Sequence, residues 1–142
     1  MGNPLDLERF LRAQAPVMAQ VCSELQAGCK QSHWIWYIFP QLAGLGRSST
    51  AQYYALGSLD EARTYLGHPV LGPRLIKCTA LVNGVEGRSV REIFGYPDDL
   101  KFHSSMTLFT LAEPDEPTFA AALDKYFAGA LDRLTTEKLG SP

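Results

Sequence analysis

The chain contains no long apolar run and no large excess of one charge. No window reaches the roughly 18 apolar residues that a membrane-spanning helix requires, so we expect no membrane partner. Thirteen Lys and Arg residues oppose fifteen Asp and Glu residues, and the formal net charge of -2 gives no strong signal for nucleic-acid binding. Internal repeats and low-complexity tracts are also missing. What is left is the composition of a folded globular protein, with 46% hydrophobic and 20% charged residues.

Cysteine is scarce, and its spacing fits neither a disulfide framework nor a zinc site. Cys22, Cys29 and Cys78 are odd in number and contain no CxxC pair. HExxH, P-loop and GxGxxG motifs are absent and the three histidines are scattered, so we expect no metal and no cofactor. Reduced thiols, together with an acidic N-terminus that lacks the apolar core of a signal peptide, favour a cytoplasmic protein.

What the chain does contain is a series of short segments with apolar residues at helical spacing. The first, residues 7–25, follows an expected cap and first-turn proline at Asn3 and Pro4, and Pro16 predicts a kink or a break within it. Later segments begin after polar residues that cap helices, namely Ser49 or Thr50, Ser58, Ser89, Asp98 or Asp99, and Thr118. We therefore predict one compact, mainly α domain over residues 1–142, made of six or seven short helices.

One apolar run shows neither helical nor strand periodicity. Apolar side chains occupy every position of WIWYIF, residues 34–39, before Pro40. The residue types favour a short strand, while six residues also fit a buried helical turn, and both alternatives stay open. The run is expected to be buried in either case.

The segment KQSHWIWYIFPQLAGLG, residues 30–46, is the first candidate for a functional site. His33 could act as a general acid or base in an apolar pocket, or it could be a core histidine bonded to a backbone carbonyl. Trp34 and Trp36 could stack on the ring of a ligand, or they could belong to the core.

Polar residues accompany these aromatics, and burial alone explains them poorly. Lys30, Ser32 and Gln41 lie within the segment as candidate ligand donors. Arg47 follows the glycine turn AGLG and precedes two serines, an arrangement that could bind an anion or could be an ordinary loop.

The segment PDDLKFHSSMTLF, residues 97–109, is the second candidate. Lys101 precedes Ser104 and Ser105 by about one helical turn, and Thr107 adds a third hydroxyl. An ammonium group, hydroxyls and a helix N-terminus could together hold a phosphate or a carboxylate. A Ser-Lys acyl enzyme is disfavoured because the SxxK order is reversed and no oxyanion-hole glycine motif accompanies it. An ordinary amphipathic helix is the alternative.

The motifs SHWxWYIFPQ and KFxSSMTLF resemble those of a bacterial family of unknown function, whose members have about this length and often carry the label calpastatin. The resemblance covers nearly the whole chain and implies no reaction that can be transferred residue by residue. A true calpastatin is a long disordered inhibitor, whereas this composition is that of a folded domain, so the label does not describe this chain.

The two segments together suggest an enzyme or a binding domain. Our first hypothesis is a small protein that binds a nucleotide-like or phosphosugar ligand of the ADP-ribose type and hydrolyses it. The alternative is a non-catalytic module that binds a protein or a nucleic acid, and the oligomeric state is left open. The candidate catalytic residues are His33, Lys101 and Ser104. The candidate ligand-binding residues are Lys30, Ser32, Trp34, Trp36, Gln41, Arg47, Ser105 and Thr107.

Overall fold

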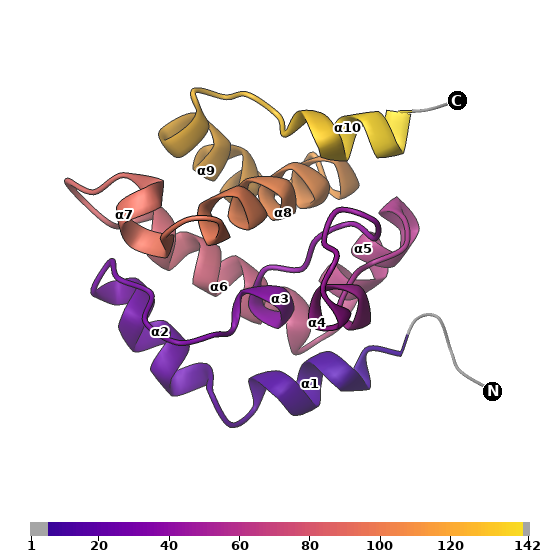
Figure 1. Cartoon of the computed structure of the whole chain (residues 1–142), viewed down its shortest axis with the longest axis horizontal. Helices are drawn as coiled ribbons and strands as arrows, with labels where there is room; N and C mark the ends of the chain where they lie inside the picture. Colours follow the sequence, from indigo (N-terminus) through magenta and orange to yellow (C-terminus); the bar gives the residue numbers. More distant parts are fainter. Residues whose placement is uncertain (1–5, 141–142) are drawn as a thin grey trace.

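Helices make up most of residues 6–140, the part of the chain that the computed structural model describes (Figure 1). Ten helices occur there, and seven of them have at least seven residues. The prediction of a mainly α, single compact domain is confirmed, while the expected cap at Asn3 and Pro4 lies outside the described residues. The helices are α1 Glu8–Gln14, α2 Met18–Gln26, α3 Ile35–Ile38, α4 Ser49–Tyr53, α5 Leu59–Gly67, α6 Leu71–Asn83, α7 Val90–Phe94, α8 Asp98–Ala112, α9 Pro117–Phe127 and α10 Arg133–Gly140.

The break predicted at Pro16 is present. Helix α1 ends at Gln14 and α2 begins at Met18, so Pro16 lies in the connection. A proline at this position cannot donate the backbone hydrogen bond that a continuous helix needs. Two short helices therefore replace one long one. No helix within residues 6–140 combines the length and the apolarity needed to cross a membrane.

The apolar run at residues 34–39 forms a helical turn and no strand. Helix α3 covers Ile35–Ile38, and Trp34, Ile35, Ile38 and Phe39 are each at most 2% exposed. Its neighbours are α1 and α8, which offer no strand edge for ladder hydrogen bonds. The extended pairing comes just after it, where an isolated parallel bridge joins Leu42 to Leu56.

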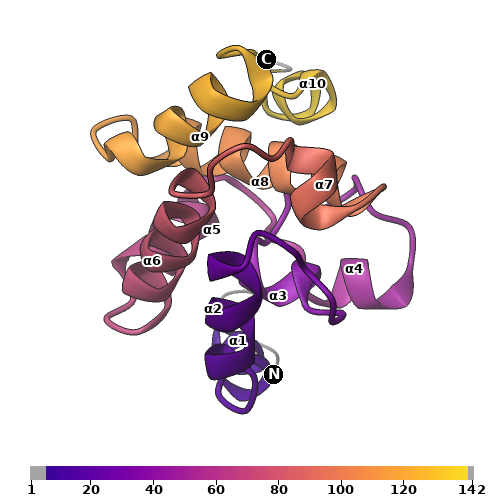
Figure 2. The same ribbon diagram turned by 90° about the vertical axis from the view of Figure 1, so that its left-hand side faces the viewer.

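Helix α8 lies at the centre of the domain. Helices α9 and α10 cover one side of it and α3 lies on the other, an arrangement visible in Figure 1 and, after a quarter turn, in Figure 2. Its residues from 104 to 109 are all buried, including the hydroxyl residues Ser104, Ser105 and Thr107. Because helices surround it, α8 has no fully solvated face along this stretch, which explains its run of small and apolar residues.

An aromatic cluster fixes α3 and α7 against the first half of α8. Phe102 stacks on Phe94 with ring centroids 4.6 Å apart, and Phe39 meets Phe102 edge-to-face at 5.0 Å. Trp34 joins the same cluster through Phe39 and Phe94. Edge-to-face and offset-stacked rings are the preferred aromatic geometries. The segment that contains Trp36 is thereby held beside the segment that contains Lys101.

Three of the five predicted caps within the described residues are correct to within one residue. Ser58 and Ser89 cap α5 and α7, as predicted. Ser48 caps α4 in place of Ser49 or Thr50, because its Oγ accepts a hydrogen bond from the Ala51 N–H. The other two predictions were wrong: α8 begins at Asp98 after Pro97 with no side-chain cap, and the Glu116 carboxylate caps α9 in place of Thr118. Pro117 occupies the first position of α9, so the capping residue must precede it.

Candidate ligand site

The two candidate segments meet at an ion pair. Lys30 Nζ lies 2.7 Å from Asp98 Oδ2, and Lys101 Nζ lies 3.5 Å from Asp98 Oδ1. Lys30 comes from the connection after α2, while Asp98 and Lys101 lie in the first turn of α8. One carboxylate thus faces two ammonium groups, which leaves these three side chains with a net charge of +1.

An indole ring lies next to each of the two lysines. Lys30 Nζ is 5.0 Å from the ring centre of Trp34, and Lys101 Nζ is 5.3 Å from that of Trp36. Both distances fall within the range of cation-π attraction. We call the five residues Trp34, Lys30, Asp98, Lys101 and Trp36 the tryptophan-lysine array.

Glu24 positions one end of this array, although nothing in the sequence pointed to it. Its Oε1 accepts hydrogen bonds from the backbone N–H groups of Gln31 and Ser32, at 2.8 and 3.1 Å, and from Trp34 Nε1 at 2.9 Å. Its Oε2 accepts a hydrogen bond from Ser32 Oγ at 2.7 Å. Partial burial alone would raise the pKa of Glu24, but the hydrogen bonds dominate and lower it to about 2.

Three predicted ligand residues already have partners within the protein. The Lys30 side chain is only 5% exposed and donates to the Ser32 carbonyl at 2.6 Å in addition to its ion pair. Ser32 and Trp34 are engaged by Glu24. These three residues hold the segment in place, and little of their hydrogen-bonding capacity faces solvent.

The other half of the array has hydrogen-bonding groups without partners. Trp36 Nε1 is buried and has no hydrogen-bond partner in the described chain. Lys101 is 25% exposed and has the long contact to Asp98 as its one ion pair among residues 6–140. His33 is exposed. Neither its ring nor the side-chain amide of Gln41 forms a hydrogen bond with another described residue. Trp36 and Lys101, which are in contact, therefore both keep hydrogen-bonding capacity.

Ser104 and Thr107 are directed to a different partner, the residue that precedes α10. Ser104 Oγ donates to Leu100 O and to Asp132 Oδ2, each at 3.1 Å. Thr107 Oγ1 accepts from the Asp132 N–H at 2.8 Å. Asp132 Oδ2 also accepts from the Thr135 N–H at 3.1 Å, so Asp132 caps α10. Ser105 is fully buried, and its hydroxyl has no partner in the part of the chain described.

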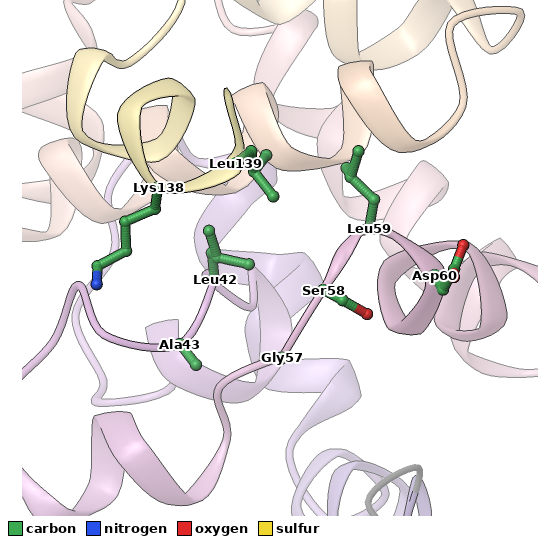
Figure 3. A pocket seen from close by; sticks show the side chains of 8 residues that line it. All are labelled: Leu42, Ala43, Gly57, Ser58, Leu59, Asp60, Lys138 and Leu139. Atoms are coloured by element: carbon green, nitrogen blue, oxygen red, sulfur yellow. The ribbon is translucent and has the colours of Figure 1, made fainter. Parts of the chain in front are cut away.

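Arg47 lies apart from the array, beside α10. It lines a hollow of about 380 Å³ together with Lys138, Leu134 and the loop residues Gly44 and Leu45. The neighbouring hollow, of about 430 Å³, is formed by the same loop, the start of α5 and α10, with Leu42, Leu59 and Leu139 on its walls (Figure 3). The surface hollows at this loop therefore share no lining residue with the array.

No three His, Cys, Asp or Glu side chains within residues 6–140 converge in a way that could hold a metal ion. The three cysteines are free thiols. Burial raises the pKa of the Cys78 thiol to about 12, with a further contribution from neighbouring Cys22. A thiol of this kind is a poor nucleophile at neutral pH.

Comparison with known proteins identifies a family of unknown function, and the label calpastatin does not occur in its description. The model of a family described as "Protein of unknown function (DUF1810)" matches residues 4–139. The crystal structure of the conserved hypothetical protein Rv1873 from Mycobacterium tuberculosis is similar throughout, with 54% sequence identity and a TM-score of 0.96. That match covers 99% of this chain and 100% of the other. No protein with a curated function matches the chain.

Proposed function

The chain belongs to the DUF1810 family of proteins of unknown function, and from that premise we propose that it binds a small anionic metabolite at the exposed end of the tryptophan-lysine array. The ligand class that suits this chemistry is a nucleotide-like or phosphosugar molecule of the ADP-ribose type. The proposal follows from the hydrogen-bonding capacity that is left at this end of the array.

One observation carries the proposal. A buried indole N–H has no hydrogen-bond partner, and a partly exposed ammonium group lies over the same indole ring. Burying a polar group without a partner costs on the order of 1–3 kcal/mol. Trp36 Nε1 is such a group, and Lys101 is the cation over its ring. An anionic oxygen would accept a hydrogen bond from the Lys101 ammonium group, and from the indole N–H once a side-chain movement exposes it, and its charge would be offset by the net positive charge of the three ionic side chains.

Hydrolysis is the further part of the proposal, and His33 is the residue that would move the proton. It is exposed and lies three positions before Trp36, and its imidazole forms no hydrogen bond with another described residue. Imidazole is the side chain most often used in proteins to accept or donate a proton. Lys101 would stabilise negative charge on the phosphate, and the hydrogen bonds of Ser104 to Asp132 favour a supporting role for that serine.

Binding is tested with a panel of nucleotides, nucleotide sugars and sugar phosphates, using calorimetry together with intrinsic tryptophan fluorescence. Trp36→Phe removes the indole N–H and retains an aromatic ring, while Lys101→Gln removes the charge. Each should weaken binding about tenfold or more, since a charge-assisted hydrogen bond contributes about 1.5–3 kcal/mol. Lys77→Gln, a change at an exposed lysine of α6, is the matched control and should bind as the wild type does.

Turnover is tested on each ligand that binds, with product analysis by mass spectrometry. His33→Gln should abolish product formation while leaving the dissociation constant within about threefold, because the residue would act on the proton and not on the phosphate. Absence of binding by every member of the panel, or equal binding by Trp36→Phe and the wild type, would refute the ligand site. Binding without turnover would restrict the protein to a non-catalytic role.

A further inference from the structure

The loop between α3 and α4 and the helix α10 enclose a second group of cations. Arg47 and Lys138 both line the hollow of about 380 Å³, whose apolar wall comes from Leu45 and Leu134. We propose that this hollow is an anion site that takes the phosphate group of a small phosphate ester. It is separate from the array, and its argument does not rest on the function proposed above.

The first support is that both cations lack a carboxylate partner. Neither the Arg47 guanidinium nor Lys138 Nζ makes an ion pair or a side-chain hydrogen bond with any residue from 6 to 140. The one carboxylate on the wall, Glu137, is bound by Arg133 at 2.7 Å. Two unpaired like charges at one hollow repel each other, and an anion between them removes that cost.

The second support is the shape of the loop at Gly44. Its φ of 93° is a backbone conformation that other residues rarely adopt. A Cβ there would lie 2.6 Å from Lys138 Nζ and 2.7 Å from its Cε, so glycine leaves the space that the ammonium end occupies. Figure 3 shows the Lys138 side chain extending from α10 toward this loop. The lysine head is therefore accommodated against the backbone of Gly44.

The third support is a row of unused backbone donors. The N–H groups of Gly44, Leu45, Gly46 and Arg47 donate to no residue in the described part of the chain, whereas the Ala43 N–H donates to Leu56 O. Free amides in a glycine turn can supply donors to an anion bound beside the loop. Cations and neutral amides together favour a doubly charged phosphate over a neutral ligand, while the leucine wall suits an apolar or ring portion of an ester.

The test uses the full chain with inorganic phosphate and pyrophosphate as probes, measured by calorimetry and by ³¹P NMR. Arg47→Gln and Lys138→Gln should each weaken pyrophosphate binding about tenfold or more. Lys77→Gln, which removes a lysine elsewhere on the surface, is the control and should leave pyrophosphate binding within about twofold. Lys101→Gln reports separately on any anion that binds at the array, and circular dichroism should show that all four variants keep the wild-type helix content.

Two results would overturn the inference. One is the absence of saturable pyrophosphate binding up to about 10 mM. The other is binding that Lys101→Gln weakens and the Arg47 and Lys138 variants do not, which would assign the anion to the array instead. Because the variants are distinct, failure here leaves the proposed function standing, and failure of the metabolite panel leaves the pyrophosphate result standing.

Discussion

Lys30 and Asp98 form an ion pair with an N–O distance of 2.7 Å, and their side chains are only 5% and 19% exposed. The pair joins the connection after α2 to the first turn of α8. The Lys30 backbone is also tied to α7, because its N–H donates to Ile93 O at 2.7 Å. The side-chain ion pair therefore joins the two motif segments, and the main-chain bond holds the first of them against α7.

Removal of the Lys30 charge should destabilise the protein. In Lys30→Met the largely buried Asp98 carboxylate retains only the 3.5 Å contact with Lys101, and breaking such a pair typically costs about 2–4 kcal/mol when some solvent access remains. Urea denaturation measures the change in the free energy of unfolding, with Lys77→Met as the exposed control. The double variant Lys30→Met/Asp98→Leu should recover part of the loss, and strictly additive effects would show that the pair is not coupled.

Glu24 should make the stability of the protein depend on acid pH. Its pKa is about 2 in the folded state, below the value near 4.3 of an unfolded glutamate. The stabilisation is therefore fully present above about pH 4.5 and is lost as the pH falls through that value toward 2. Glu24→Gln should lower the free energy of unfolding by on the order of 1 kcal/mol at pH 7, after allowance for solvent screening. Chemical denaturation between pH 2 and 7 measures both effects, and parallel pH profiles for variant and wild type would refute the assignment.

Asp132 should stabilise the last helix through the hydroxyl groups of α8. Asp132→Ala removes the cap of α10 and the acceptor of Ser104, which together should cost about 1–2 kcal/mol. Hydrogen exchange measured on this variant and on the wild type should show that the substitution accelerates the exchange of amides in α10 more than that of amides in α9. In contrast, Ser104→Ala should lower stability by only about 1 kcal/mol. If the proposed hydrolysis is detected, a loss of turnover in Ser104→Ala at wild-type stability would support Ser104 as a catalytic residue.

The three thiols should differ in reactivity. Cys78 is 1% exposed and its pKa is raised to about 12, so it should resist iodoacetamide at pH 8 in the folded protein. Cys22 and Cys29 are only partly buried and should react first. Peptide mass mapping of the labelled protein measures the order, and full labelling in denaturant is the control. Early labelling of Cys78 would mean that α2 and α6 open readily in the native state.

Local rules in the sequence predicted the helical character and most helix boundaries. Pro16 breaks the first helical segment and Ser58 caps α5, because backbone chemistry at a single residue decides such features. The caps of α8 and α9 were predicted wrongly, because Pro97 precedes α8 and leaves it without a side-chain cap, and Pro117 at the start of α9 moves the cap from Thr118 to Glu116. Neighbouring helices decided the backbone of residues 34–39, which were equally suited to a strand by residue type.

The sequence by itself determined that this is a helical domain of its family and that two polar, aromatic segments stand out from the core. Only the tertiary structure decided which residues of these segments have partners within the protein and which keep free hydrogen-bonding groups. It engages Lys30, Ser32 and Trp34 with Asp98 and Glu24, and it leaves Trp36 and Lys101 with unused capacity. It also separates Arg47 from the array and places it beside Lys138. The physical reason is that a helix boundary depends on residues a few positions apart, whereas the partner of a buried charge is set by which distant segments the packed core brings together.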